Sequence, residues 1–284
     1  MNKSKLLVHL HIFYHDQVDF FIEKLKNING YDWDLIVTYC DENESTNHKL
    51  IDFKPNCRLQ KVGNVGYDVL PFIKVIKSID IYKYDYILKL HTKNYQQKLY
   101  LNGFKKGGYW WRNELINPLI GSKRSFAKCI NEFKNNNKIG FICSEIMLWD
   151  IENYWPEDTY MLKDELNRIN FKSKYNKFCA GTMFIARADI FRFLQKIDID
   201  ENKFPIAGKT KTTGTIAHVY ERIFTIAADE FGYEVLTIKN HKEYFMKYFV
   251  KYLEKIFSLK NKYLKNNVKH KVITILGIKI TIKC

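Results

Sequence analysis

The chain has 284 residues, of which 46% are hydrophobic and 27% are charged, as in an ordinary folded domain with one sizeable core. The net charge of +15 is unevenly distributed: twelve lysines and two glutamates give residues 239–284 a charge of +10, so the first 238 residues carry +5. A uniformly basic nucleic-acid-binding protein does not fit this distribution. We expect a nearly neutral domain over residues 1–238 and a basic tail over residues 239–284.

The six cysteines form no Cys-x-x-Cys pair and no zinc spacing, so buried thiols in a reducing cytoplasm are expected rather than disulfides. The apolar stretch near the N-terminus is interrupted by His9, His11 and His15, unlike a signal peptide. No run reaches the roughly 18 apolar residues that a membrane-spanning helix needs. These features predict a cytoplasmic protein.

Strand-like and helix-like segments alternate along the first 238 residues. Strands are expected over residues 5–13, 34–39, 58–62, 84–90, 139–144, 178–186 and 233–238, and helices over 18–28, 69–79, 113–120, 126–135, 191–197 and 216–232. Loops are expected over residues 40–49, 102–108 and 203–215, with an irregular insertion over 145–176. Alternation in units of roughly 30 residues predicts an α/β fold with a mostly parallel, Rossmann-like sheet flanked by helices.

The strand over residues 84–90 is followed by three polar residues, His91, Thr92 and Lys93. Ligands of open α/β sheets bind at the carboxyl ends of the strands. Lysine binds phosphate as a point charge, and His and Thr can add hydrogen bonds to phosphate oxygens. A solvated loop or a helix stop explains the same three residues with equal weight.

A loop with two glycines follows the strand over residues 58–62. Its Asn64 and Asp68 can hold the ribose and base of a nucleotide, because glycine allows close approach of the backbone. An ordinary β-turn is an alternative of equal weight. His9 and His11 lie on one strand face without a third metal ligand, so no metal site is expected, and His11 is expected to face the same cleft.

The helix over residues 216–232 carries four polar side chains on one face. His218, Glu221, Arg222 and Thr225 are spaced i, i+3, i+4 and i+7. A carboxylate between His and Arg can act as a general base whose charge is balanced by its neighbours. A surface ion pair of Glu221 with a nearby basic side chain is the alternative.

Six motifs resemble, in order, those of the rhamnan-synthesis F family of bacterial cell-surface polysaccharide glycosyltransferases. They are His11-Ile-Phe-Tyr14, Asn64-Val-Gly-Tyr-Asp68, Leu90-His-Thr-Lys93, Tyr109-Trp-Trp-Arg112, Ala180-Gly-Thr-Met-Phe184 and His218-Val-Tyr-Glu-Arg222. The succession of strand, glycine-Asn loop, helix and second strand also resembles the nucleotide-sugar half of GT-A glycosyltransferases. The resemblance extends from residue 5 to about residue 238 and implies a GT-A-like fold.

The resemblance implies transfer of a sugar from a nucleotide diphosphate donor to a growing, lipid-linked cell-surface polysaccharide, with inversion at the anomeric carbon. Rhamnose from dTDP-rhamnose or galactofuranose from UDP-galactofuranose is the expected sugar. Most GT-A enzymes place a metal-binding Asp-x-Asp where this chain has Leu90-His91-Thr92-Lys93. Since hard cations prefer carboxylate oxygens, we expect metal-independent transfer without a cofactor, in which these side chains neutralise the leaving diphosphate.

The same resemblance gives each candidate residue a role. Glu221 is expected to deprotonate the acceptor hydroxyl, with Glu145 and Asp150 as alternatives. Trp111 and Arg112 are expected on the acceptor side, and a structural role for Trp111 is an equal alternative. Tyr67 departs from the basic residue expected of the family, which leaves the donor's identity open. The residues expected to bind the donor are His11, Asn64, Asp68, His91, Thr92, Lys93, Gly181, Thr182, His218 and Arg222.

The tail predicts a basic amphipathic helix over residues 245–265, followed by a hairpin or edge strand over residues 272–282 around Gly277. Aromatic and aliphatic residues fall on one side of the helix and lysines on the other, a pattern typical of helices at a membrane surface. We therefore expect a peripheral protein on the inner face of the cell membrane. A helix packed on the domain is the alternative.

The sequence disfavours two other functions. A non-catalytic basic module that binds membrane or nucleic acid is disfavoured by the nearly neutral main domain. A nucleotide-dependent phosphotransferase is disfavoured because the chain lacks a phosphate-cradling Gly-x-x-x-x-Gly-Lys loop.

Overall fold

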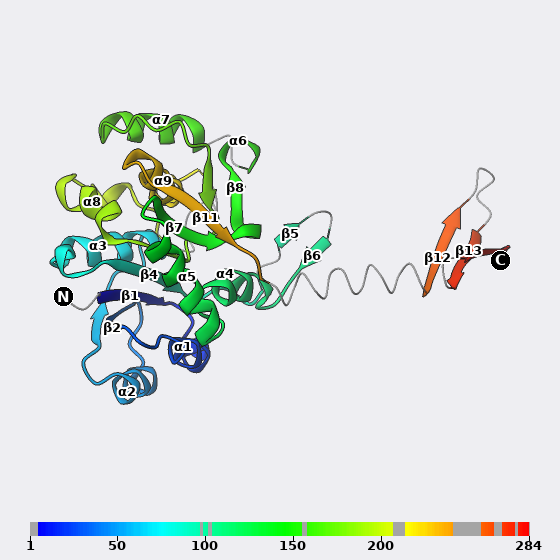
Figure 1. Ribbon diagram of the computed structural model, residues 1–284, viewed down its shortest axis with the longest axis horizontal. Coiled ribbons are helices and arrows are strands. Elements are labelled where there is room, and N and C mark those ends of the chain that lie inside the picture. The colour runs from blue at the N-terminus through cyan, green and yellow to red at the C-terminus, as the bar shows by residue number, and fades with distance from the viewer. Residues whose placement is uncertain are drawn as a thin grey trace. The chain divides into compact units, whose positions relative to one another are not determined.

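The computed structural model describes residues 5–96, 99–101, 104–154, 158–206, 214–240, 257–263, 269–275 and 278–283 (Figure 1). The chain divides into two compact units, Met1–Ile238 and Lys239–Cys284. None of the helices in the described ranges is long and apolar enough to cross a membrane.

The centre of the first unit is a seven-stranded sheet with the order β11-β7-β10-β4-β1-β2-β3. Its strands are β1 (Lys5–Ile12), β2 (Asp32–Tyr39), β3 (Arg58–Lys61), β4 (Tyr86–His91), β7 (Ile139–Ser144), β10 (Phe184–Arg187) and β11 (Glu234–Ile238). Only β10 runs against its neighbours, β4 and β7, whereas the other pairs in this sheet are parallel. The predicted α/β class with a mostly parallel sheet is confirmed.

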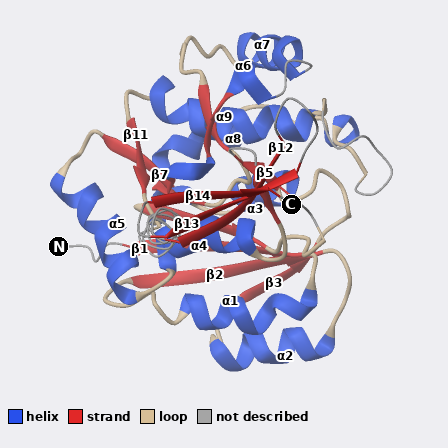
Figure 2. Ribbon diagram, turned by 90° about the vertical axis from the view of Figure 1, so that its right-hand side faces the viewer, coloured by secondary structure: helices blue, strands red, loops and turns tan. Residues whose placement is uncertain are grey.

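Helices cover both faces of this sheet (Figures 1 and 2). One face carries α3 (Val69–Ser78), α8 (Arg192–Lys196) and α9 (Ile216–Glu230), and the other carries α1 (Val18–Leu25), α2 (Glu44–Phe53), α4 (Trp110–Ile120) and α5 (Lys123–Asn135). On the first face the ring of Phe72 lies edge-on to Phe191 and Phe224, with centroids 5.2 and 5.1 Å apart. This aromatic packing fixes α3 and α9 on the sheet at the end that carries the candidate site.

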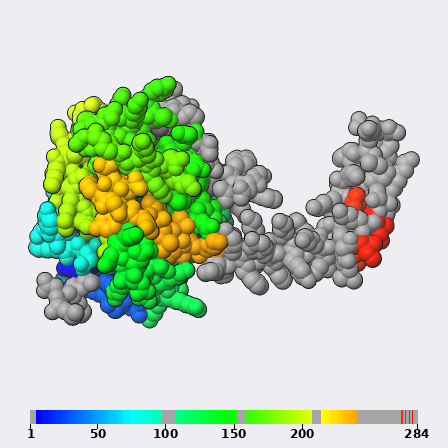
Figure 3. Space-filling view, turned by 45° about the horizontal axis from the view of Figure 1, so that its top comes forward, coloured from blue at the N-terminus to red at the C-terminus, as the bar shows by residue number. Residues whose placement is uncertain are grey.

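Further helices and strands complete the first unit. They are η1 (His15–Gln17), η2 (Ile81–Lys83), η3 (Glu145–Met147), η4 (Ala188–Phe191), η5 (Glu201–Lys203), α6 (Ile151–Tyr154), α7 (Asp158–Arg168) and the strand pairs β5 (Leu99–Leu101) with β6 (Phe104–Lys106) and β8 (Leu148–Asp150) with β9 (Lys177–Cys179). Figure 3 shows one face of this unit, on which segments from its second half, green to orange, lie side by side.

Four local predictions for the first unit are wrong. Residues 40–49 were expected as a loop but contain the start of α2, whose N-cap Asn43 accepts a hydrogen bond from Thr46 N at 2.9 Å. The supposed irregular insertion contains α7, and the loop expected after residue 102 contains β6. The strand expected over residues 178–186 is broken into β9 and β10, because Gly181 and Thr182 adopt positive φ angles of 92° and 48°.

The second unit contains an antiparallel sheet of β12 (Phe257–Tyr263), β13 (Lys269–Ile275) and β14 (Ile278–Lys283). The hairpin expected around Gly277 is confirmed by the pairing of β13 with β14. The helix expected over residues 245–265 is wrong at β12, where the backbone pairs as a strand. The remainder of that predicted helix lies outside the described residues.

Candidate active site

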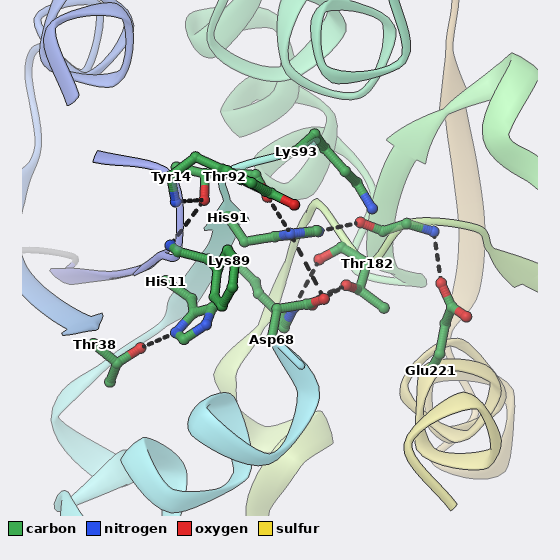
Figure 4. A network of polar contacts seen from close by, with 12 residues as sticks. His11, Tyr14, Thr38, Asp68, Lys89, His91, Thr92, Lys93, Thr182 and Glu221 are labelled. Carbon is green, nitrogen blue, oxygen red and sulfur yellow. Dashed lines mark hydrogen bonds and ion pairs between the residues drawn. The ribbon is translucent and has the colours of Figure 1, made fainter. Parts of the chain in front are cut away.

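The candidate site lies where β1 and β4 end side by side. His11 stands opposite His91 in the parallel register, and polar side chains from β4, the loop before α3 and the turn before β10 converge there (Figure 4). This is the end of the sheet at which open α/β folds bind ligands. The geometry separates these side chains into two sets.

The inner cluster consists of Asp68, Lys89, His91 and Thr182. Lys89 is fully buried; its ammonium group pairs with the Asp68 carboxylate and donates to Thr182 Oγ1 at 2.9 Å and Thr182 O at 3.1 Å. The Thr182 hydroxyl donates to Asp68 as well. A buried ammonium group therefore has three oxygen acceptors, which offsets the cost of removing its charge from water.

His91 connects the inner cluster to the turn before β10. Its Nε2–H donates to the Gly181 carbonyl at 2.7 Å, while Nδ1 lies 3.6 Å from the Asp68 carboxylate. Burial lowers the pKa of His91. Burial alone would raise the pKa of Asp68, but His91 and Lys89 hold that pKa well below its usual range, so Asp68 is ionised.

Two histidines on β1 lie beneath this cluster. His9 Nε2 and His11 Nδ1 each lie 2.9 Å from Thr38 Oγ1, so the single hydroxyl donates to one ring and accepts from the other. Burial lowers the pKa of His11 to about 4, and it lowers the pKa of His9 as well. Both rings are therefore neutral near pH 7.

Thr92 and Lys93 are held by their neighbours at the end of β4. Thr92 Oγ1 accepts hydrogen bonds from Phe13 N at 2.9 Å and Tyr14 N at 3.1 Å, so this hydroxyl fastens the end of β1 to β4. Gln17 donates to Lys93 O at 2.7 Å and accepts from Lys93 N at 3.3 Å. These two hydrogen bonds fix the backbone of Lys93, and its side chain takes no part in them.

The outer group consists of Lys93, Trp111 and Glu221, which surround Gly181. The Lys93 ammonium group lies 4.3 Å from the centroid of the Trp111 ring, and Glu221 Oε1 accepts from Gly181 N at 2.6 Å. Burial lowers the pKa of Lys93, and Asp68 and Glu221 oppose this effect. Among the described residues, neither Lys93 Nζ nor the buried Trp111 Nε1 has a hydrogen-bond acceptor.

Backbone strain is concentrated around the inner cluster. Tyr67 and Thr182 have positive φ angles of 56° and 48°, which are uncommon for residues other than glycine. Tyr67 directly precedes Asp68, so both strained residues adjoin the contact between Asp68 and Thr182. Strain of this kind persists where the surrounding contacts fix the backbone, and it is often found at functional sites.

Gly181 is close-packed. A Cβ at this position would lie 2.8 Å from Leu115 Cδ1 and 3.0 Å from Trp111 Nε1. Side chains of α4, rather than open space, thus face its Cα. The packing against α4 therefore accounts for a glycine at this position.

The four polar residues expected on one face of α9 lie in different surroundings. Arg222 is fully buried, with its guanidinium group 4.7 Å from the centroid of Phe178, and Thr225 Oγ1 accepts from Cys179 N at 3.0 Å. His218 is half-buried and contacts Thr215 Oγ1 at 2.8 Å. Of the four, only Glu221 belongs to the outer group, whereas Arg222 is buried and donates to His218 O, and donor binding by Arg222 stays a prediction.

Arg112 is likewise buried rather than exposed to an acceptor. Its guanidinium group lies between the rings of Phe20 and Tyr109, at 3.5 and 3.8 Å, and donates to Gln17 Oε1 at 3.1 Å. Burial lowers the pKa of Arg112 to about 10. Arg112 thus contacts the glutamine that bonds to the Lys93 backbone, and acceptor binding by Arg112 stays a prediction.

The remaining candidates lie around this centre. Asn64 is exposed after β3, with Oδ1 3.9 Å from the Cys40 thiol. The alternative bases Glu145 and Asp150 belong to η3 and β8, outside the two sets defined above. The five cysteines of the described ranges are free thiols.

Three residues of the site were not found from the sequence: Lys89, Thr38 and Gln17. A lysine inside the apolar run of β4 was a usable signal, because a charge on a buried strand requires a partner. Thr38 and Gln17 gave no comparable signal. Their roles depend on neighbours from distant parts of the chain.

A family model described as rhamnan synthesis protein F matches residues 1–233. The chain belongs to this family. The family prediction made from the six motifs is thus confirmed. Among curated proteins, the uncharacterized protein WxcX of Xanthomonas campestris pv. campestris (strain B100) is 26% identical over 182 residues, which are 62% of this chain and 24% of WxcX. The match spans about a quarter of that relative.

Solved structures are similar at a lower level. TarS of S. aureus gives a TM-score of 0.43 at 9% identity, covering 89% of this chain and 66% of that chain. Glucosyl-3-phosphoglycerate synthase from Mycobacterium tuberculosis, in complex with Mn²⁺ and UDP-glucose, gives 0.41 at 10% identity, covering 98% and 89%.

The mycobacterial complex holds Mn²⁺, at odds with the prediction of metal-independent transfer, and that prediction is withdrawn. That prediction relied on a missing acid pair at the end of β4. Mg²⁺-type cations often take only one or two protein carboxylates and complete their shell with substrate phosphates and water, so a missing pair does not decide the question. Within the described ranges, no group of three or more His, Cys, Asp or Glu side chains is arranged to hold a metal ion.

Proposed function

We propose that the first unit is a glycosyltransferase that moves a sugar from a nucleotide diphosphate to a glycan. The observation that carries this proposal is the outer group. Two donors, Lys93 Nζ and Trp111 Nε1, lie together without an acceptor from the described residues, and the Glu221 carboxylate is held on the other side of Gly181. An anion binds beside such donors, and a carboxylate nearby can accept a proton.

The proposed reaction is a single displacement. Glu221 takes the proton of an acceptor hydroxyl, and the hydroxyl oxygen forms a bond to the anomeric carbon of the donor sugar. The bond from that carbon to the diphosphate oxygen breaks, and the electron pair leaves with the nucleoside diphosphate. Lys93 and the Trp111 N–H stabilise the negative charge that develops on this leaving group. A single displacement inverts the anomeric carbon.

The substrates of the proposal follow from the family. Rhamnan synthesis is the description of the matching family model, which supports a rhamnosyl or related galactofuranosyl donor linked to dTDP or UDP. Asp68 and Asn64, at the end of the loop after β3, are the residues proposed for the nucleoside. The acceptor of the proposal is a growing, lipid-linked cell-surface polysaccharide.

A thermal-shift screen of the full chain with dTDP, UDP, GDP and CMP tests the proposal. We expect one nucleoside diphosphate to raise the melting temperature and CMP to leave it unchanged. The matching nucleotide sugar should then release its diphosphate only when an octyl glycoside acceptor is added. A chain that no nucleotide stabilises and that releases no diphosphate would contradict the proposed function.

We also propose that the basic unit Lys239–Cys284 binds an anionic membrane surface at the inner face of the cell membrane. Its net charge of +10 supports the proposal, because each lysine near an anionic surface contributes about 1 kcal/mol. Full-length chain should sediment with phosphatidylglycerol vesicles and remain in solution with phosphatidylcholine vesicles. If a chain ending at Ile238 sediments equally well, the unit is not the membrane contact.

A further inference from the structure

A cavity lies in the first unit, between α7, α9 and the segment around η5. Its volume is about 310 Å³, within the range of small-molecule sites. The walls include Glu165 and Arg168 from α7, Tyr220 from α9, and Asp198 and Phe204 from the segment around η5. None of the inner cluster or the outer group lines it.

One wall of the cavity is a preformed set of hydrogen-bonding groups. Arg168 forms two hydrogen bonds with the Glu165 carboxylate, at 2.6 and 2.8 Å. The Tyr220 hydroxyl donates to Glu165 at 2.5 Å and accepts from Arg168 at 3.1 Å. The three side chains hold one another in place, so a ligand would meet them already oriented.

Two of the residues that line the cavity, Phe204 and Tyr220, are aromatic. The rings of Phe204 and Tyr220 are stacked with centroids 5.9 Å apart and an angle of 29° between their planes. Both residues are buried, whereas Asp198 and Lys203 at the cavity are exposed. The cavity thus combines an apolar, aromatic interior with polar groups that are open to solvent.

The charge of the lining excludes two classes of ligand. Three carboxylates (Glu165, Asp198 and Asp200) stand against two cations (Arg168 and Lys203), so a phosphate or diphosphate would meet net negative charge. The three acids do not form a metal-binding group. The lining suits a neutral ligand with several hydroxyl groups. The hydroxyls of such a ligand can bond to paired carboxylate and guanidinium groups, and its C–H faces can pack on aromatic rings.

The cavity is joined to the candidate active site by two elements. Tyr220 directly precedes Glu221 on α9. Gly66, two residues before Asp68, packs closely against Phe204: a Cβ on Gly66 would lie 2.7 Å from Phe204 Cδ1. The Gly66 N–H also donates to Pro205 O at 2.8 Å. Lys74 of α3 pairs with Glu201 at 2.5 Å, which fastens the same segment to the helix that follows Asp68.

We infer that this cavity is a binding site for a neutral saccharide, distinct from the nucleotide site. A saccharide there would contact Tyr220 and the segment that supports the Asp68 loop. The statement that this saccharide is part of the acceptor glycan rests on the proposed function. The statement that the cavity binds a saccharide does not depend on that function.

The test is saturation-transfer NMR of the full chain with disaccharides of rhamnose and of galactofuranose, without any nucleotide. Asp198→Ala removes an exposed carboxylate of the cavity and should weaken saccharide binding about tenfold, as for a hydrogen bond to a charged group. Tyr220→Phe, which keeps the ring, should weaken binding as well. Asp52→Ala removes an exposed carboxylate of α2 and should have no effect.

The outcomes separate this inference from the proposed function. Saccharide binding that depends on Asp198 and Tyr220 supports the cavity even in a chain that transfers no sugar. Wild-type binding by both folded cavity variants would overturn the inference, whatever the transferase activity. Displacement of the saccharide by inorganic phosphate would also overturn it, because the site would then select anions.

Discussion

Two lysines four residues apart on the same segment have opposite surroundings. Lys89, in the inner cluster, is fully buried and bonded to Asp68 and to two oxygens of Thr182. Lys93, in the outer group, is half-buried and contacts the face of Trp111 without an oxygen acceptor among the described residues. A charge whose bonds are all made within the protein holds the fold together, whereas a charge with bonds still to make is suited to a ligand.

Removal of Lys89 should have the largest effect on stability. Lys89→Met leaves the Asp68 carboxylate and the Thr182 oxygens without their cation, and we expect a loss of about 3–5 kcal/mol in the free energy of unfolding. Urea denaturation measures this loss. The exposed Lys128→Met on α5 is the matched control and should change stability by less than about 0.5 kcal/mol. A cost as small as the control's would remove the distinction between the two lysines.

Glu221→Gln should abolish turnover without a comparable effect on stability. The amide oxygen still accepts a hydrogen bond from Gly181 N, but it takes no proton, so kcat should fall about 10²- to 10⁴-fold. Nucleotide affinity, measured by calorimetry, should stay the same. Glu145→Gln and Asp150→Asn serve as comparisons, and the base would be reassigned if either of them, rather than Glu221→Gln, stopped transfer.

Lys93→Met should weaken nucleoside diphosphate binding about 10- to 100-fold and leave the fold intact. Because burial lowers the pKa of Lys93 below 10.5, its positive charge is lost at a lower pH than that of an ordinary lysine. Wild-type affinity should therefore decline as the pH rises through this lowered pKa. Lys93→Arg, which keeps its charge, should bind without that decline; identical pH profiles for the two proteins would place the diphosphate elsewhere.

The smallest effect is expected for Arg112→Lys. Lysine lacks the planar group that stacks between Phe20 and Tyr109, so stability should fall by about 1 kcal/mol. Since Arg112 acts through Gln17 on Lys93, the KM for the donor should rise while kcat changes little. A large fall in kcat would instead indicate direct contact of Arg112 with the reacting groups.

Much of the fold was predictable because the strands β1, β4 and β7 are buried on both faces and form apolar runs between polar turns. The helix α2 was missed since only Thr46 and Leu50 of its ten residues are buried, so it has no apolar stripe. The direction of β10 was not predictable, because hydrophobic periodicity does not distinguish a parallel from an antiparallel strand. The break before β10 depends on the left-handed backbone of Thr182, which its residue type does not indicate.

The site was predictable in its location more than in its contacts. Polar residues at the end of β4 marked the end of the sheet where the inner cluster and the outer group lie, and Glu221 was selected through helical spacing together with the family resemblance. That spacing shows which residues share a face but not which way the face points, and Arg222 is in fact buried. Lys89 was missed because its partners, Asp68 and Thr182, lie 21 and 93 residues away in the chain.

The reversed strand β10 has a consequence for how the protein folds. It inserts between β4 and β7, and the turn before it supplies Thr182, which meets Asp68 across 114 residues of chain. Contacts of such long sequence separation form late, because chain entropy must be lost before they contribute stability. Before β10 pairs with β4, the ammonium group of Lys89 lacks two of its three acceptor atoms, Thr182 O and Thr182 Oγ1. We therefore expect residues 5–91 to be unstable as an isolated fragment, with sheet completion and site assembly occurring in one cooperative step.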